Sequence, residues 1–423
     1  MLGWEFPPVI NGGLGVACLG ISNALAKKVD LTLILPKSDP DFVVNNVELI
    51  GLNNLDIEEV KDTVVHSQYI EDFKVQYIKT NINPYSNSEE VITETKSETK
   101  TSTEVIPGKP RGLELFKQEG DTSYGDNLID KVIAYAKYAA SLAKDMDFDV
   151  IHANDWMTFM AGLEIKKQSG KPLALHVHAL DYDRGGADSR GWIYNVEKEA
   201  MLEADVVIPV SDYTGKIITE YYGIEADKIK PVHNGVDTIE ASKTEKAFPE
   251  SMVLFLGRLT AQKGPEFFLD IADKVIAKND KVRFVIAGTG DKLKRLIETG
   301  AYKSVSNKFH FTGFLNKEKV NEVLGMADIY CMPSVSEPFG LSALEATQYG
   351  VPAVISKQSG VAEVLNGALK ADYWDVDLMA QHILDLIEDD KLKAKVVDLG
   401  YKDLKKLTWD HTADKLIKIF DKL

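Results

Sequence analysis

Cysteine is almost absent from this chain, which holds only Cys18 and Cys331 among its 423 residues. Cys18 lies in a helix-like stretch and Cys331 in a strand-like one, and the pair lacks the spacing of metal ligands. This excludes a metal site built on cysteine. We expect both thiols to be buried in the core of a protein that works in a reducing compartment.

A positive charge balance and long apolar runs are also missing. The net charge of −16 disfavours nucleic acid and anionic membrane surfaces as partners, because both need clustered lysine and arginine. No apolar run approaches the length that spans a bilayer. The first residues, Met1–Pro8, have neither a basic region nor a long apolar core, so no signal peptide is expected. The sequence predicts a soluble, cytoplasmic protein without membrane insertion.

Strand-like and helix-like segments alternate along almost the whole chain. This alternation predicts an α/β protein with parallel sheets, and a length of 423 residues favours two domains. We expect a first Rossmann-like, doubly wound domain over residues 1–240 and a second over 250–407. The polar, unpatterned residues 238–250 form the predicted linker. An amphipathic C-terminal helix over 408–423 could cross back to the first domain.

Two segments of the first half stand out. The predicted first strand, Met1–Phe6, is short, which leaves open whether the protein begins a few residues upstream. Residues 83–110 are rich in Thr, Lys, Glu and Ser and lack the apolar content to offset the entropy of ordering. We expect an exposed, mobile loop there, and a flexible lid is the functional alternative.

The most informative segment is a strand–turn–helix pattern over residues 329–346. A buried strand over 329–332 is followed by Glu337, then by a helix opening at Gly340, with Glu345 two turns further on. The free N–H groups of a helix N-terminus suit a phosphate or diphosphate. One acid could face a sugar and the other a ribose. The pattern suggests a nucleotide-sugar site, and an ordinary capped turn is the alternative.

A pair of cations follows the strand 252–256 in the same half. Arg258 and Lys263 precede a helix that begins near Gly264, in a chain that is otherwise acidic. Because parallel strands bind ligands at their carboxyl ends, this loop and the Glu337 loop should meet. Two solvated surface cations are the alternative to a diphosphate clamp. The segment 288–290 lacks the third glycine and the spaced acid of a dinucleotide fingerprint, so no NAD site is predicted.

The strand ends of the first domain offer further candidates. Gly13 belongs to a glycine pair that opens a helix and could lie beside a phosphate or sugar. His178 ends a strand on the same face as His176, and is better placed to donate a hydrogen bond into a cleft. Asp155 and Trp156 end a neighbouring strand, where they could contact a sugar acceptor. Core packing explains Trp156 equally well.

Together these motifs resemble a retaining glycosyltransferase of family 4, with the two-domain GT-B fold, close to the glycogen and starch synthases. The resemblance covers nearly the whole chain and is most specific at the two acids Glu337 and Glu345. It implies that Arg258 and Lys263 bind the donor diphosphate, that Glu345 holds the ribose and that Glu337 faces the transferred sugar. Backbone N–H groups would bind the same phosphates, and the first domain would contribute sugar contacts; these residues are Gly340, Leu341, Ser342, His178, Gly13 and, for the acceptor, Asp155 and Trp156.

The resemblance implies transfer with retention at the anomeric carbon, without a metal and without a cofactor beyond the donor. The bacterial ADP-glucose-dependent synthases usually carry Lys-Thr-Gly-Gly at the first loop, whereas residues 10–13 here are Ile-Asn-Gly-Gly. UDP-glucose is therefore as good a candidate donor as ADP-glucose. The leading hypothesis is extension of a soluble α-glucan. The alternatives are another acceptor (a small sugar, a sugar phosphate or a surface polysaccharide), a nucleotide-sugar epimerase and an inactive sugar-binding protein.

Overall fold

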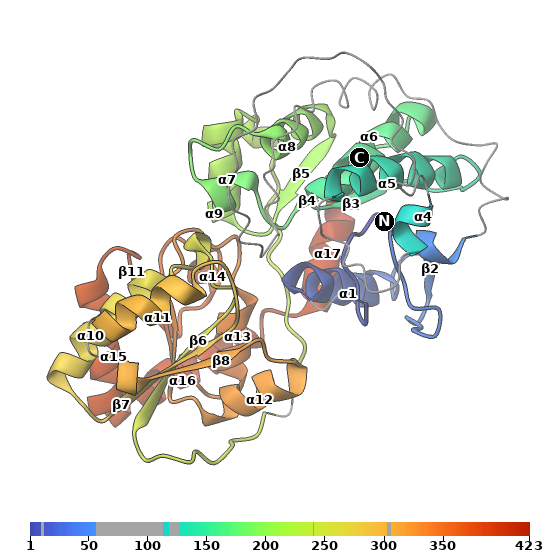
Figure 1. Ribbon diagram of the computed structural model, residues 1–423. Helices are drawn as coiled ribbons and strands as arrows, with labels where there is room; N and C mark the ends of the chain where they lie inside the picture. Colours follow the sequence, from blue (N-terminus) through green and yellow to red (C-terminus); the bar gives the residue numbers. More distant parts are fainter. Residues whose placement is uncertain (10–11, 56–112, 118–126, 240, 303–305) are drawn as a thin grey trace, which may run out of the picture.

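Two α/β domains make up the protein, as the ribbon in Figure 1 shows. The computed structural model describes residues 1–9, 12–55, 113–117, 127–239, 241–302 and 306–423. The stretch 83–110, predicted to be a loop or lid, lies outside these residues. No helix in the described ranges is both long and apolar enough to cross a bilayer.

The sheet of the first domain is parallel throughout and has a Rossmann strand order. Its order is β2–β1–Leu2–β3–β4–β5, because Leu2 forms bridges to Ile34 on one side and to Ala153 on the other. In chain order this is 3-2-1-4-5-6, the doubly wound arrangement. The strands are β1 (Leu31–Leu35), β2 (Val47–Gly51), β3 (Ile151–Asn154), β4 (Leu173–Val177) and β5 (Val206–Pro209).

The predicted first strand, Met1–Phe6, is wrong in its extent. Backbone hydrogen bonds to the two neighbouring strands involve only Met1, Leu2 and Gly3. The neighbours β1 and β3 end at Leu35 and Asn154, so neither of them continues beside the residues that follow. The segment therefore contributes a single bridging residue to the middle of the sheet.

Helices cover both faces of this first sheet. On β4, Leu173, Leu175 and Val177 pack with the cluster that includes α5, α6 and α8, whereas Ala174 packs with α1. This alternation follows from the two-residue period of a strand. The helices are α1 (Gly13–Leu25), α4 (Glu114–Lys117), α5 (Leu128–Ala143), α6 (Trp156–Ser169), α7 (Asp181–Gly185), α8 (Trp192–Glu203) and α9 (Asp212–Ile217), with the short turns η1 (Leu52–Asn54), η2 (Ile218–Tyr222) and η3 (Ala226–Lys228).

The second domain contains a six-stranded parallel sheet with the order β11–β10–β9–β6–β7–β8. This is again 3-2-1-4-5-6, and the chain reverses direction across the sheet between β6 and β9. The strands are β6 (Ser251–Leu256), β7 (Val282–Ala287), β8 (Phe309–Gly313), β9 (Ile329–Met332), β10 (Ala353–Ser356) and β11 (Ala368–Ala371).

Two separate hydrophobic clusters line the faces of the second sheet. One joins Val253 and Phe255 to α10 and α15, and the other joins Met252 and Leu254 to α13. Buried Cys331 packs in the first of these clusters, and Cys18 is buried in the first domain, which confirms that both thiols are core residues. The helices and turns are η4 (Ala261–Lys263), α10 (Pro265–Lys278), α11 (Leu293–Tyr302), η5 (Ser306–Lys308), α12 (Lys317–Met326), α13 (Leu341–Gln348), α14 (Val361–Val364), α15 (Val376–Glu388) and α16 (Asp390–Leu404).

The last helix, α17 (Trp409–Phe420), packs on α1 of the first domain, and both chain ends lie on that domain in Figure 1. Gly20 allows the close approach, because a Cβ there would lie 2.1 Å from the indole of Trp409. Lys27 and Lys28 of α1 pair with Asp410 and Asp414 of α17, each at 2.8 Å. The chain therefore crosses between the domains twice, once near Gly235 and once after α16.

Candidate active site

The switch point of the second sheet, between β6 and β9, brings two of the predicted residues together. Lys263 follows β6 and Glu337 follows β9, and their Nζ and Oε2 atoms lie 2.5 Å apart. The lysine side chain is 23% exposed and the glutamate 8%. Open parallel sheets bind ligands outside the carboxyl ends of the strands at this point.

Glycine explains how closely these two loops approach. Gly264 has φ of +65°, and a Cβ there would lie 2.1 Å from the carbonyl oxygen of Pro333. The backbone N–H of Val335 donates to the carbonyl of Gln262 at 2.8 Å, which fastens one loop to the other. Lys263 is thereby held against the loop that carries Glu337, rather than projecting freely.

Glu337 is fixed by its own backbone as well as by Lys263. Its N–H donates to Gln358 at 2.9 Å, and it forms a parallel bridge with Ser359. The hydroxyl of Ser334 donates to the same carboxylate oxygen as the lysine, at 3.3 Å. The carboxylate is therefore nearly buried and pre-positioned, as a residue that contacts a reacting group must be.

The helix after this turn begins as predicted, with Gly340 as its N-cap at φ +107° and ψ +54°. A Cβ at Gly340 would lie 2.9 Å from Val361, so glycine suits both the conformation and the packing. Leu341 and Ser342 stand in the first turn of α13, where backbone N–H groups have no intrahelical partner. The hydroxyl of Ser342 lies 2.7 Å from that of Tyr330.

The other predicted donor contacts flank this turn. Arg258 is exposed on the loop after β6, and Glu345 is half-buried on α13. Burial raises the pKa of the Glu345 carboxyl, and Lys317 opposes that effect. The segment 288–290 packs on the β6 loop, since a Cβ at Gly290 would lie 2.4 Å from the carbonyl of Leu259. Tight loop packing thus accounts for these glycines.

In the first domain, His178 lies just past the end of β4 and stacks on His176, with ring centroids 4.4 Å apart. Its Nε2 is 3.1 Å from the side-chain oxygen of Asn154, so this nitrogen carries the proton and donates. Burial lowers the pKa of His178 to about 3. The imidazole is therefore neutral in the physiological range, with its Nδ1 as an acceptor. His176 is fully buried, which confirms the prediction that it is a packed histidine.

Asp155 occupies a strained position at the end of β3. It has φ of +66° and ψ of +162°, a region that is essentially restricted to glycine, and it is only 4% exposed. Its carboxylate accepts the N–H of Ala179 at 3.2 Å, next to His178. Burial raises the pKa of Asp155 to about 7, against the opposing effect of Arg184. Strain of this kind persists where the surroundings enforce it, often at functional sites.

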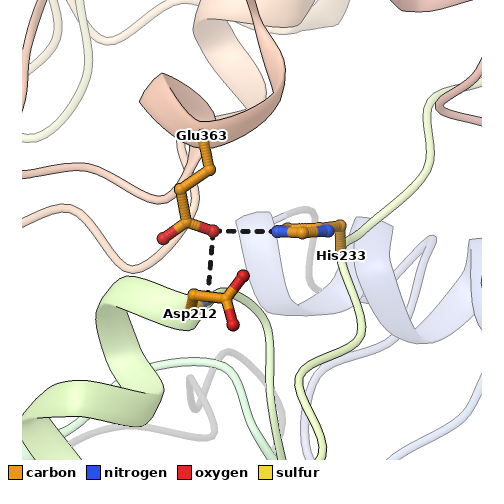
Figure 2. Close-up of side chains that lie close together, drawn as sticks. All are labelled: Asp212, His233 and Glu363. Atoms are coloured by element: carbon orange, nitrogen blue, oxygen red, sulfur yellow. Dashed lines mark hydrogen bonds and ion pairs between the residues drawn. The ribbon is translucent and has the colours of Figure 1, made fainter.

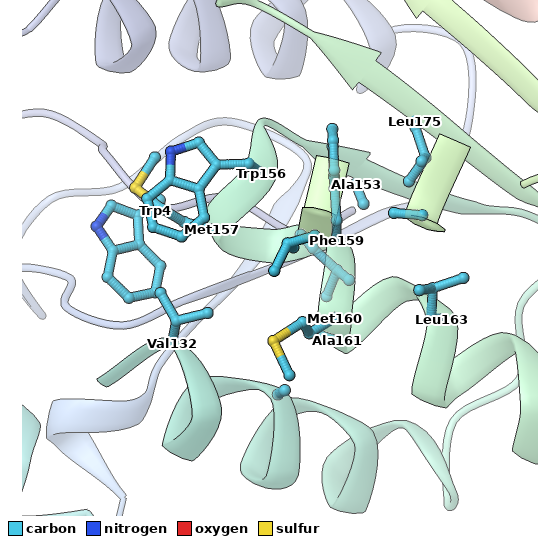
Figure 3. Close-up of a cluster of buried hydrophobic side chains, with 14 of the residues drawn as sticks. Trp4, Val132, Ala153, Trp156, Met157, Phe159, Met160, Ala161, Leu163 and Leu175 are labelled. Atoms are coloured by element: carbon cyan, nitrogen blue, oxygen red, sulfur yellow. The ribbon is translucent and has the colours of Figure 1, made fainter. Parts of the chain in front are cut away.

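The neighbouring Trp156 is placed in the core, the packing alternative. Its indole is 0% exposed and meets that of Trp192 edge to face at 5.8 Å. Figure 3 shows Trp156 among the buried side chains of this domain, beside Met157 and Phe159. The acceptor contact predicted for Trp156 is wrong in this structure, because the indole has no accessible surface to offer.

The glycine pair at the start of α1 lies beside Glu5, a residue that sequence reasoning missed. A Cβ at Gly12 would lie 2.3 Å from a carboxylate oxygen of Glu5, whereas a Cβ at Gly13 would meet none of the described residues within 4 Å. The same carboxylate accepts the N–H of Gly15 at 3.2 Å. Within the described part of the chain, Gly13 thus has space beside it, and the Glu5 carboxylate lies against Gly12. An acid within the apolar stretch Leu2–Phe6 was the available signal.

The two domains meet beside Glu337. Helix α7, which follows His178 in the chain, contacts the turn η4 that carries Lys263. Ser336 donates a 2.5 Å hydrogen bond to Asp183 of α7 and lies 3.1 Å from the hydroxyl of Tyr213. The β4 end of the first domain is thereby held against the Lys263–Glu337 pair. Asp183, Tyr213 and Ser336 carried no local sequence signal.

A second interdomain contact joins Glu363 to the start of α9 (Figure 2). The carboxylate of Glu363 accepts the N–H groups of Asp212 at 3.0 Å and Tyr213 at 2.5 Å, and its Oε2 lies 2.9 Å from Nε2 of His233. Asp212, His233 and Glu363 lie close enough together to hold a metal ion. These hydrogen bonds account for the arrangement on their own, since a carboxylate is the usual partner of a helix N-terminus.

Replacing Asp155 by asparagine should change how stability depends on pH. Between about pH 4 and pH 7 the folded protein holds a proton on Asp155 that the unfolded chain has lost, because the pKa is raised from 3.8 to about 7. Wild-type stability should therefore fall as pH rises through this window, by up to about 1.4 kcal/mol per pH unit from this group. The variant Asp155→Asn should lack this component in urea unfolding curves recorded from pH 4 to pH 8. If the free energy of unfolding changed with pH equally in both proteins, the expectation would be contradicted.

Comparisons with known proteins agree with this architecture. Residues 116–240 match the family model described as Glycosyltransferase Family 4, and residues 237–403 match that of Glycosyl transferases group 1. An uncharacterized glycosyltransferase of Methanocaldococcus jannaschii is 30% identical over 294 residues, which cover 64% of this chain and 75% of that protein. A glycogen synthase of Mycobacterium tuberculosis is also 30% identical, over 52% of this chain and 55% of its own length.

Among solved structures, sucrose-phosphate synthase from Thermosynechococcus elongatus superposes with a TM-score of 0.70. The match covers 100% of this chain and 95% of that one at 16% sequence identity, so it speaks for the fold alone. The predicted family and fold class are confirmed. The chain is a member of glycosyltransferase family 4 and has the GT-B fold of two Rossmann-like domains.

Proposed function

We propose that this glycosyltransferase moves glucose, with retention, from a nucleoside diphosphate glucose to the end of a soluble α-glucan. One observation carries the donor half of the proposal. A cation–carboxylate pair, Lys263 and Glu337, lies at the switch point of the second sheet, next to the N-terminus of α13 and against α7 of the first domain. The lysine and the helix N-terminus suit a diphosphate, and the carboxylate suits the hydroxyl groups of a sugar.

The proposed contacts with the donor combine opposite charges and hydrogen bonds. Arg258 and Lys263 would bind the two phosphates and stabilise them as they leave, and the N–H groups of Gly340, Leu341 and Ser342 would bind the same oxygens. Glu345 would accept the ribose hydroxyls. When the donor binds, Lys263 would turn from Glu337 to the phosphates. The carboxylate of Glu337 would then be free to contact the transferred sugar.

The reaction exchanges one bond at the anomeric carbon for another. The bond from that carbon to the diphosphate oxygen breaks, and the electron pair leaves with the nucleoside diphosphate. The acceptor hydroxyl then attacks from the same face, and its proton goes to the departing phosphate oxygen. The protein lowers the barrier mainly by stabilising the negative charge of the leaving group and the positive charge on the sugar.

The first domain would supply hydrogen-bonding groups to the donor sugar and to the acceptor. His178 has its pKa lowered to about 3, so it would contact the donor sugar as an uncharged imidazole and not as a general acid at neutral pH. Gly13, with no described residue within 4 Å of a Cβ placed on it, would leave room for a sugar or phosphate. Asp155, with its pKa raised to about 7, would accept hydrogen bonds from the acceptor once ionised.

A donor and acceptor screen tests the function directly. The protein would be incubated with ADP-glucose and with UDP-glucose, each with and without glycogen, and release of nucleoside diphosphate would be measured. We expect release with one of the donors and stimulation by glycogen. If none of the sugar donors released its nucleoside diphosphate, the enzyme proposal would be refuted.

The acceptor is the point on which the alternative differs. The glycogen synthase similarity spans about half of that relative's length, so a small sugar, a sugar phosphate or a surface polysaccharide is the second candidate class. Equal nucleotide release with and without glycogen, together with stimulation by one of these acceptors, would favour the alternative. The acidic net charge of −16 disfavours an acceptor embedded in an anionic membrane and so favours a soluble one.

Transfer should not depend on a divalent metal. Arg258 and Lys263 supply the positive charge that a metal would otherwise bring to the diphosphate. We expect EDTA to change kcat less than about twofold, well below the roughly hundredfold loss typical when one charge-stabilising group is removed. The control is the same assay with added magnesium and manganese. Loss of turnover in EDTA that magnesium restores would contradict this expectation.

A further inference from the structure

A cavity of about 250 Å³ lies at the joint between the domains, away from the Lys263–Glu337 pair. Its walls come from the first crossing (His233, Asn234), from the loop before β11 and from the end of α16 and start of α17. The functional proposal above makes no use of it. Its lining is unusual for so acidic a chain.

Basic side chains gather in this cavity. Lys406, His411 and Lys415 line it together with His233. Neither lysine forms an ion pair with any residue that the structure describes, although other lysines on these helices do, such as Lys402 with Asp398. The acid in the wall, Asp403, already accepts the side-chain amide of Asn366 at 3.1 Å and the N–H of Gly367 at 2.9 Å. The two lysines are thus available to an anion.

A helix N-terminus adds to this positive potential. Thr408, the N-cap of the twelve-residue helix α17, also lines the cavity, and its hydroxyl accepts the N–H of His411 at 3.2 Å. The N-terminal end of a helix carries a partial positive charge that favours phosphate groups. The helix end and the two lysines therefore act in the same direction.

Asn234 provides an independent indication of a ligand. It is 5% exposed, it lines the cavity, and its side-chain oxygen has no hydrogen-bond partner within the described parts of the chain. A buried polar atom without a partner costs free energy, and such atoms are rare in folded proteins. A hydroxyl group in the cavity would donate to this oxygen.

From these observations we propose that the cavity binds a small phosphorylated sugar or polyol, with its phosphate at Lys406, Lys415 and the start of α17 and a hydroxyl at Asn234. The charge arrangement recognises the phosphate and the amide recognises the hydroxyl. The volume suits a ligand of this size better than a nucleotide sugar, since drug-sized ligands occupy pockets of about 300–1,000 Å³.

The position links the ligand to both domains. His233, in the cavity wall, lies 2.9 Å from Glu363, which caps α9 of the first domain, and its ring centroid is 5.9 Å from that of Phe339. Phe339 precedes Gly340 at the start of α13. A ligand beside His233 would therefore contact the joint itself, close in the chain to the proposed donor loop.

Isothermal titration calorimetry in phosphate-free buffer tests the site, with inorganic phosphate, glucose 6-phosphate and glucose as probes. Wild type should bind glucose 6-phosphate more tightly than inorganic phosphate, and glucose not at all. Lys406→Gln and Lys415→Gln should each raise the Kd for both phosphates about tenfold, the loss of one charge-assisted contact. Asn234→Ala should remove the preference for glucose 6-phosphate over inorganic phosphate.

Matched controls separate this cavity from the rest of the molecule. Lys405 and Lys418 are exposed neighbours outside the cavity, and their replacement by glutamine should leave the Kd within about twofold of wild type. Arg258→Ala, in the proposed donor loop, should also leave it unchanged. The proposal is overturned by absence of phosphate binding at millimolar concentration, by an unaltered Kd in both Lys406→Gln and Lys415→Gln, or by loss of binding in Arg258→Ala, which would place the phosphate at the donor site. None of these outcomes depends on which acceptor the enzyme uses.

Discussion

Replacing Lys263 by glutamine is expected to lower kcat for sugar transfer by about 10²–10³-fold, the usual cost of removing one group that stabilises developing charge. In the proposed mechanism its ammonium group neutralises the departing diphosphate, and glutamine can donate a hydrogen bond but carries no charge. Steady-state kinetics with saturating donor would measure the loss. Because the stabilisation acts mainly in the transition state, kcat should fall more than the KM for the donor rises.

The ion pair of Lys246 with Asp328 provides a matched control. Its lysine is 20% exposed, close to the 23% of Lys263, and Asp328 precedes β9, at the opposite end of the strand from Glu337. Lys246→Gln should therefore cost similar stability without lowering kcat by more than about twofold. If Lys263→Gln and Lys246→Gln retain equal turnover, the role assigned to Lys263 is wrong.

The architecture of each domain followed from the sequence only in part. Alternation of strands and helices predicted parallel sheets, and the structure confirms it for both domains. Periodicity did not supply the strand order, because it describes one segment at a time and says nothing about its neighbours in the sheet; the order was implied only by the expectation of Rossmann-like domains. Leu2 illustrates the limit, since its place between β1 and β3 depends on residues 32 and 151 positions away.

The meeting of Lys263 and Glu337 was predictable for a definite reason. Each residue follows a buried strand closely, and the carboxyl ends of parallel strands lie on one edge of a sheet. That β6 and β9 are adjacent was the remaining unknown, and their pairing brings the two residues to 2.5 Å. Gly264, also picked out in the sequence, permits the contact by its packing against Pro333.

The contacts between domains could not be predicted, because they join segments that carry no joint pattern. Asp183 and Ser336 are 153 positions apart, and each looks like an ordinary loop residue. Glu363 lies on a four-residue helix, and only the three-dimensional fold reveals that it caps α9. The prediction for Trp156 was wrong for a different reason. The residue does lie at the end of a strand, but a side chain there can turn into the core as readily as into the cleft.

Replacing Glu337 by glutamine is expected to lower kcat by a similar factor of about 10²–10³, because a negative charge beside the transferred sugar is lost. The carboxylate stabilises the positive charge that develops at the anomeric carbon. Glutamine has nearly the same shape but carries no charge. The single change should also reduce the free energy of unfolding by about 1–3 kcal/mol, since Lys263 loses its partner. Denaturant unfolding and steady-state kinetics on the same preparation would separate these two effects.

The double variant Lys263→Gln/Glu337→Gln distinguishes a structural pair from a catalytic one. Removing both charges of a largely buried pair is often nearly neutral for stability, whereas removing one leaves the other uncompensated. We therefore expect the double variant to unfold within about 1 kcal/mol of wild type and to be more stable than either single variant. Its turnover should stay at or below that of the weaker single variant, because both electrostatic contributions to the transition state are gone. Activity that returned together with stability would mean that the pair only holds the β6 and β9 loops in place, and that other groups, with Arg258 the first to examine, bind the leaving diphosphate.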